Sequence, residues 1–110
     1  MDYIDQYGVR YSEDKSTLIQ CPETFEGACV ILEGTTTIED CGFYDCAKLT
    51  SVTIPRSLKF IGEEAFQNCE QLAEIHYQGT MTEWEKIEKE YTNYDYANVV
   101  HCIDGDIKLW

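Results

Sequence analysis

Cysteine and histidine are the residue types in this chain that could carry metal or redox chemistry. The 110 residues include six Cys and two His, enough side chains in number for a zinc site or for several disulfides. Structural zinc uses closely spaced ligand pairs such as Cys-x-x-Cys, whereas Cys41 and Cys46 are separated by four residues. His101 and Cys102 are adjacent, so on a strand they would point to opposite faces. We therefore expect neither a metal site nor a cofactor.

Two other patterns that could support chemistry have simpler explanations. Asp104-Gly105-Asp106 places two carboxylates close together, but calcium-loop spacing is absent and the flanking residues alternate as strands, so an ordinary turn is favoured. Catalysis requires a nucleophile or an acid–base group beside an orienting partner. The sequence contains no Gly-rich phosphate loop, no His-Glu-x-x-His and no Gly-x-Ser-x-Gly. We expect a protein that is not an enzyme and has no catalytic residues.

Composition and charge restrict the class of partner. The formal net charge is −13, which repels nucleic-acid phosphates and anionic membrane surfaces. No stretch approaches the roughly 20 apolar residues that span a bilayer, and residues 1–5 do not look like a secretory signal. With 44% hydrophobic and 13% aromatic residues, the chain should fold as one domain. We expect no nucleic-acid binding and no membrane insertion, and the compartment stays open.

One sequence pattern occurs twice between residues 38 and 77. Apolar residues of the first copy recur at an interval of 23 residues: Ile38, Phe43, Cys46, Leu49, Val52 and Ile54 correspond to Ile61, Phe66, Cys69, Leu72, Ile75 and Tyr77. A fixed period of this length is typical of solenoid proteins, in which successive coils stack. Cys29 and Ile31 fit the same interval, so a partial copy precedes the two full ones.

Within each copy the pattern predicts one short strand and one turn. Alternating apolar residues at Val52 and Ile54, and at Ile75 and Tyr77, indicate strands with one face inward. The segments around Phe43 and Phe66 should each form a single helical turn whose aromatic ring fills the core. Stacked coils would also bury Cys46 and Cys69 as free thiols, with a disulfide between them as the alternative.

The two flanks of the repeats predict different elements. Residues 8–11 and 16–20 surround a polar turn and indicate a hairpin that ends at Pro22, while residues 1–7 should be loosely attached. After the repeats, Thr80 and Glu83 form a capping box, with Thr82 and Glu85 as the alternative register. Apolar residues on one face of the helix follow as a stripe: Met81, Trp84, Ile87 and Tyr91. Residues 98–103 and 107–110 then indicate a second hairpin. Both ends would then be capped, as in a complete small solenoid or a terminal module.

The repeats resemble the BspA-type leucine-rich repeat family. Copies in that family read roughly Ile, Ala-Phe, Cys, Leu, Ile and Ile-Pro, and the matching residues here include Ile61, Ala65, Phe66, Cys69, Leu72 and Ile75. Gly42 departs from the usual Ala, and Tyr77-Gln78 replaces Ile-Pro. The segment 77–84 is similar to a terminator of the family. The resemblance implies a bacterial or protist source and, for many longer members, adhesion at the cell surface.

The side of the strands that faces away from the core is the candidate binding surface. Residues that alternate with the inward ones should point outward, and solenoids commonly bind partners there. These candidate partner-binding residues are Val30, Ser51, Thr53, Glu74 and His76, together with Ala28. They could also be ordinary solvated strand residues. Tyr91, Tyr94 and Tyr96 form a second candidate patch, unless they pack over the neighbouring cap.

Together these observations predict an α/β leucine-rich-repeat solenoid of one domain, residues 1–110. It would comprise a lead-in and hairpin cap (1–22), repeats (23–79) and a helix with a hairpin cap (80–110). The expected function is protein–protein interaction, with cell-surface adhesion as one form of it, by a monomer or a weakly self-associating chain whose protein partner is unidentified. The alternative is a structural cap or spacer of a larger repeat protein.

Overall fold

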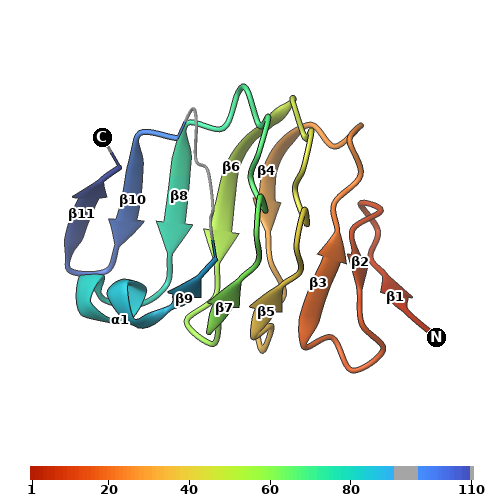
Figure 1. Ribbon diagram of the computed structural model, residues 1–110, viewed down its shortest axis with the longest axis horizontal. Coiled ribbons are helices and arrows are strands. Elements are labelled where there is room, and N and C mark those ends of the chain that lie inside the picture. Colours follow the sequence, from red (N-terminus) through yellow and green to blue (C-terminus); the bar gives the residue numbers. More distant parts are fainter. Residues whose placement is uncertain (91–96, 110) are drawn as a thin grey trace.

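The chain winds into a β-solenoid of about three turns (Figure 1). The structure is a computed structural model that describes residues 1–90 and 97–109. Each turn contributes one strand to each of two sheets, here called sheet A and sheet B. The principal extents of the molecule are 37 × 26 × 23 Å. This architecture agrees with the predicted leucine-rich-repeat solenoid, although it contains little helix.

Sheet B contains the strands that the repeat predicted. Its strand order is β11-β10-β8-β6-β4, and all neighbours except β10 and β11 run parallel. The bounds are Gly27–Val30 (β4), Leu49–Ile54 (β6), Glu74–Tyr77 (β8), Val99–Cys102 (β10) and Gly105–Lys108 (β11). Cys29 pairs with Val52, Val52 with Ile75, and Ile75 with Val100, so one row of buried residues crosses the sheet.

Sheet A was not predicted, because its strands inside the repeats are only two residues long. Its order is β1-β2-β3-β5-β7-β9, with parallel pairing from β3 to β9 and antiparallel pairing before that. The bounds are Tyr3–Ile4 (β1), Arg10–Tyr11 (β2), Thr17–Gln20 (β3), Thr37–Ile38 (β5), Phe60–Ile61 (β7) and Glu88–Lys89 (β9). Leu18, Ile38 and Ile61 lie in register and are fully buried. They form the side of the core opposite sheet B.

The segments around Phe43 and Phe66 do not form the predicted helical turns. Each consists of successive turns that are not helical. Asp45 and Asn68 occupy equivalent positions and have φ of 60° and 62°, which a right-handed helix does not allow. The backbone N–H of Phe43 donates to the carbonyl of Ala65 in the next coil at 2.7 Å. Alternate N–H groups of this segment bond to the next coil, and those between them, such as Tyr44 and Cys46, close short turns within the segment. The Asn68 side chain adds another bond between coils by donating to the Asp45 carboxylate at 2.8 Å.

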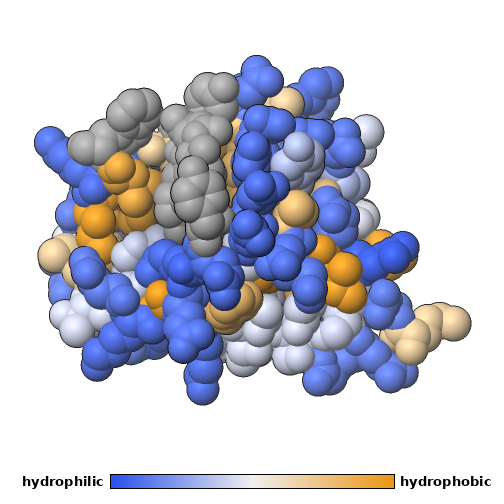
Figure 2. Space-filling view, viewed as in Figure 1, coloured by the Kyte–Doolittle hydropathy of each residue, from blue (hydrophilic) through white to orange (hydrophobic). Residues whose placement is uncertain are grey.

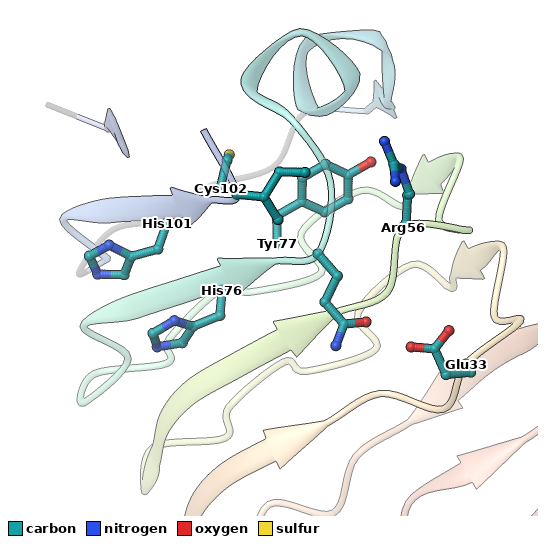
Figure 3. A pocket seen from close by; sticks show the side chains of 8 residues that line it. Glu33, Arg56, His76, Tyr77, His101 and Cys102 are labelled. Carbon is teal, nitrogen blue, oxygen red and sulfur yellow. The ribbon is translucent and has the colours of Figure 1, made fainter. Parts of the chain in front are cut away.

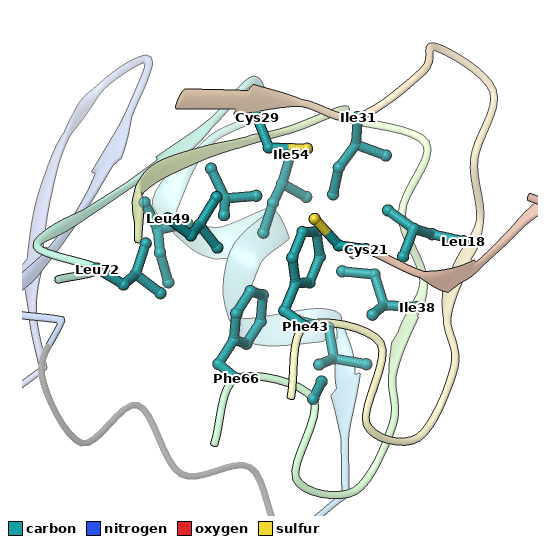
Figure 4. Packing of buried hydrophobic residues seen from close by; sticks show 14 of the residues in the cluster. Leu18, Cys21, Cys29, Ile31, Ile38, Phe43, Leu49, Ile54, Phe66 and Leu72 are labelled. Atoms are coloured by element: carbon teal, nitrogen blue, oxygen red, sulfur yellow. The ribbon is translucent and has the colours of Figure 1, made fainter. Parts of the chain in front are cut away.

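Equivalent side chains from successive coils stack in the core (Figure 4). The rings of Phe43 and Phe66 are nearly parallel, with centroids 5.1 Å apart and an interplanar angle of 8°. Cys46 and Cys69 are buried free thiols, as predicted, and Cys69 Sγ donates to the Phe43 carbonyl at 3.0 Å. Burial raises the pKa of the Cys69 thiol to about 12. All six cysteines are free, so the disulfide alternative does not apply.

The N-terminal hairpin is present as β2 and β3, but the expectation of a loose lead-in is wrong. Residues Tyr3–Ile4 form β1 and pair with β2. Asp5 fixes the connection, because its carboxylate accepts backbone hydrogen bonds from Tyr7 and Val9, both at 2.9 Å. The ring of Tyr3 also lies 6.3 Å from that of Tyr11, which is fully buried. Local polar contacts therefore order a segment that has no apolar period.

The C-terminal helix α1, Met81–Lys86, begins with the predicted capping box. Thr80 accepts the backbone N–H of Glu83 at 3.1 Å, and Glu83 accepts that of Thr80 at 3.0 Å. The helix is shorter than the predicted stripe because Ile87 is extended and leads into β9. Trp84 is buried and meets Tyr77 edge-on, with ring centroids 5.4 Å apart. Tyr91, the last residue of the stripe, lies outside the described residues.

The second hairpin is formed by β10 and β11, and its turn is displaced from the predicted Asp-Gly-Asp segment. Cys102 pairs with Gly105, so the two turn residues are Ile103 and Asp104. Asp104 accepts the backbone N–H of Met81 at 2.9 Å, and this contact connects the turn to the start of α1. Gly105 has φ of +151° and lies against Met81, where an added Cβ would come within 2.8 Å of sulfur. Among residues 1–90 and 97–109, no helix has the length and apolar character needed to cross a bilayer.

Candidate functional site

The exposed side of sheet B, here called the outer face, consists of the residues that alternate with the buried row. Val30 pairs with Thr53, Thr53 with His76, and His76 with His101, and these four residues form one row across four strands. A second row runs beside it through Ala28, Ser51, Glu74 and Val99. All five predicted partner-binding residues therefore lie in two adjacent rows.

The outer face changes character from one end to the other. Val30 is 65% exposed at the β4 end and Ala28 beside it is also exposed, so this end is apolar. Ser51 and Thr53 are half-buried and carry hydroxyl groups in the middle of the sheet. Glu74 is exposed at the other end, next to the half-buried imidazole of His76. A partner on this face would meet an apolar, a hydroxyl and an ionisable region in turn.

His101 is the site residue that sequence reasoning missed. Its side chain follows His76 in the row, and the two rings stack with centroids 5.0 Å apart. The 23-residue interval did not predict this, because from Ile75 it leads to Asn98, whereas the sheet pairs Ile75 with Val100. The last coil is therefore two residues longer than the others. The alternation from Val100 to His101 was the available signal, since it places the imidazole outward.

Two carboxylates hold both ring nitrogens of His101. Nδ1 lies 2.8 Å from Asp106 Oδ1, and Nε2 lies 3.0 Å from Glu74 Oε1. Only the protonated imidazole can donate from both nitrogens, so this geometry favours the charged form. The hydrogen bonds to Asp106 and then Glu74 accordingly raise the pKa of His101. The second Glu74 oxygen lies 3.7 Å from Nε2 of His76, which completes a cluster of four side chains.

A shallow depression of about 500 Å³ adjoins this cluster. His76 and His101 project side by side from neighbouring strands at one end of it, and Arg56 and Glu33 lie at the other (Figure 3). Arg56 makes a two-pronged contact with Glu83, at 2.7 Å from Nη2 and 3.0–3.1 Å from Nε. This guanidinium, with the Thr80 backbone, lowers the pKa of Glu83 to about 2. The contact ties the rim of the depression to helix α1.

The repeat geometry agrees with the comparison with known families. The family model described as "BspA type Leucine rich repeat region (6 copies)" matches residues 23–99. The chain belongs to this family. No curated protein and no solved structure matches it. BspA-type leucine-rich repeats, like other solenoids of this kind, typically serve as non-enzymatic scaffolds and are often used in protein interaction.

The site of this BspA-type repeat offers hydrogen bonds and charge. In the described part of the chain, no group of three or more His, Cys, Asp or Glu side chains is arranged so that it could hold a metal ion. The partly buried thiols also favour the protonated form, because burial, followed by nearby carboxylates, raises the pKa of both Cys41 and Cys102. The second candidate patch, Tyr91, Tyr94 and Tyr96, falls outside the described residues.

Proposed function

We propose that this BspA-type repeat module binds a protein partner through the outer face of sheet B. The observation that carries the proposal is the pair of adjacent rows across four strands, which presents apolar, hydroxyl and ionisable groups on one continuous surface. Hydrogen bonds within the sheet fix the backbone beneath these side chains, so binding requires little ordering of the protein. Binding, rather than catalysis, is the role that this surface supports.

The size of the face predicts a weak interaction. Specific stable complexes bury about 800 Å² on each partner, and strands of four to six residues from about three coils provide a smaller surface. In the view of Figure 2, hydrophilic residues cover most of the surface and hydrophobic residues form separate patches. On the outer face itself, Ser51, Thr53, Glu74 and His76 carry polar or ionisable side chains, so polar and charged contacts should dominate recognition and affinity should fall as salt concentration rises. Attachment at a cell surface, where many weak contacts add up, is one use that suits such a module.

Charge favours a basic partner. The chain carries a net charge of −13, and Glu33, Glu74 and Asp106 lie at the depression or the histidine cluster. Complementary charge raises the rate of association and disfavours acidic competitors. The competing function is a spacer or cap within a larger repeat protein. In that case the outer face would bind nothing of its own.

The test is selection from a displayed library of random peptides, followed by titration of the enriched peptides. The test variant combines Thr53→Ala, Glu74→Ala and His76→Ala on the outer face. The control combines Glu39→Ala, Lys59→Ala and Glu88→Ala, exposed residues along sheet A that change the net charge by the same amount. We expect the test variant alone to lose at least tenfold in affinity. The proposal would be contradicted if the enriched peptides bound the original chain, the test variant and the control variant equally. It would also be contradicted if no peptide were enriched.

A further inference from the structure

Sheet B ends at β4 with an edge that no described strand pairs. At the N-terminal end, β2 and β1 extend sheet A beyond β3, but among residues 1–90 and 97–109 sheet B has no corresponding strand beyond β4. The backbone N–H groups of Gly27 and Ile31 donate to β6 and its flank, reaching the carbonyls of Lys48 and Thr53 at 3.1 and 3.0 Å. Because backbone groups alternate along a strand, the N–H and C=O groups of Ala28 and Val30 face away from β6.

The rest of the N-terminal region covers only one end of this edge. The next outward N–H in the alternation belongs to Leu32, and it donates to the hydroxyl of Tyr11 at 3.3 Å. The N-terminal region therefore already uses one outward group of the edge. The segment Gly27–Val30 contains no lysine, no proline and no charge, which are the side chains that protect many edge strands, and its one irregularity is a register shift between Gly27 and Ala28. An uncharged open edge of this kind readily accepts another strand.

A groove of about 410 Å³ runs beside the open edge. Tyr7, Phe25 and Val30 line it, and Tyr7 and Val30 are 64% and 65% exposed. The rings of Tyr7 and Phe25 meet edge-on, with centroids 6.3 Å apart, and form an apolar wall. Asp5 and Glu26 also line the groove and supply carboxylates. A strand added to β4 would therefore place one of its side chains against this apolar wall. The side chains on either side of that residue would lie near the two carboxylates.

We propose that the β4 edge binds an extended, basic segment of a partner protein as an additional strand of sheet B. Backbone pairing would use the outward groups of Ala28 and Val30, and an apolar side chain would enter the groove. The net charge of −13 disfavours a second copy of this chain as the occupant and favours lysine or arginine beside the apolar residue. The site adjoins the outer face proposed above but uses the backbone edge, so it does not depend on that proposal.

The probe is a seven-residue synthetic peptide of alternating valine and lysine, titrated into the ¹⁵N-labelled full chain. We expect the amide signals of Ala28 and Val30 to move most, together with those of residues that line the groove. The same peptide with every backbone nitrogen methylated has no N–H group to donate from either edge, so it should bind at least tenfold more weakly. This comparison uses the unaltered protein and does not depend on the folding of a variant. Equal binding of the methylated peptide, or no binding of either, would overturn the proposal.

Variants of the protein separate the edge from the outer face. Val30→Pro removes an outward N–H but leaves the pairing with β6 intact, and edge strands tolerate proline. We expect it to weaken peptide binding at least tenfold, whereas Val30→Ala, which keeps the N–H, should have a smaller effect. The outer-face triple variant should bind the peptide within about twofold of the original chain. Loss of binding in that variant instead would assign the peptide to the outer face and overturn the edge site.

The chemistry of the occupant is tested separately. A peptide with glutamate in place of lysine should bind at least tenfold more weakly at low salt, because Asp5 and Glu26 would repel it. Equal binding of the acidic peptide would contradict the proposed basic partner. If the amide signals of Ala28 and Val30 move with protein concentration in the absence of peptide, a second copy of the chain occupies the edge. That result would also contradict the proposed basic partner.

Discussion

The inner and outer faces of sheet B consist of alternate residues of the same strands, yet their chemistry differs. The inner row, Cys29, Val52, Ile75 and Val100, is apolar throughout and no member is more than 3% exposed. The outer row, Val30, Thr53, His76 and His101, contains an aliphatic, a hydroxyl and two imidazole side chains. Stacking of coils restricts the inner residues to one kind of chemistry. The outer residues meet no such requirement, so they are free to serve recognition.

The largest expected effect comes from a buried aromatic side chain that faces the inner side of sheet B across the core. Phe66 is 1% exposed and stacks on Phe43, so Phe66→Ala removes one ring of a stack that joins two coils. We expect a loss of about 3–5 kcal/mol in the free energy of unfolding, measured by urea denaturation. Phe66→Leu is the control and should lose less, because it leaves a smaller cavity. A loss below about 1 kcal/mol for Phe66→Ala would mean that the stack does not stabilise the core.

A pair of neighbouring substitutions on β8 compares the two faces directly. Ile75 is fully buried and His76 is half-buried on the outer face. Ile75→Ala should lower the free energy of unfolding by about 2–5 kcal/mol. His76→Ala should change it by about 0.5 kcal/mol or less, as is usual for surface substitutions. Equal losses in denaturation experiments would show that the two faces are not distinct in their contribution to stability.

Helix α1 extends the comparison to a polar contact at the end of the solenoid. Thr80→Ala removes the hydroxyl that accepts the Glu83 N–H, and should cost about 1 kcal/mol. Thr82, exposed within the same helix, is the matched control, and Thr82→Ala should be close to neutral. Thermal unfolding monitored by circular dichroism would measure both. A larger loss for Thr82→Ala would place the helix start in the alternative register.

The smallest effect concerns the charge of His101 on the outer face. Its pKa is raised by Asp106 and then by Glu74, so the folded state favours the protonated ring. The resulting stabilisation is fully present below the ordinary histidine pKa of about 6.5 and disappears as pH rises through the raised value. Because the side chain is partly exposed, the change in stability should be small.

An NMR titration of the imidazole signals checks this prediction. The pKa of His101 should lie above about 6.5, and Asp106→Asn should lower it more than Glu74→Gln does. A value at or below about 6.5 in the original chain would contradict the contacts that hold both ring nitrogens.

The inner face accounts for most of what the sequence could predict. Apolar residues at a constant interval marked β6 and β8, their inward side chains and the burial of Cys46 and Cys69, because the same interior must be filled in each coil. The capping box was readable because Thr80 and Glu83 are a local pair with one geometry. The outward positions of the predicted site residues followed from strand alternation alone.

Other features depend on contacts between coils that no local pattern encodes. Sheet A strands such as Phe60–Ile61 are two residues long and show no alternation. The segment around Phe43 resembles a helical turn in sequence, but alternate N–H groups in it, including that of Phe43, bond to the next coil. His101 was missed because the last coil is longer than the repeat interval, so its register depends on pairing between β8 and β10.

The most direct test of this account is a nuclear Overhauser experiment on methyl-labelled protein. Parallel stacking of equivalent residues predicts methyl contacts between Val52 and Ile75 and between Ile75 and Val100, with the spectral pattern of parallel strands between β6 and β8. Strong contacts between the α-protons of β6 and β8, which are typical of antiparallel pairs, would contradict it. So would the absence of any contact between Val52 and Ile75, because both faces of sheet B are defined by that register.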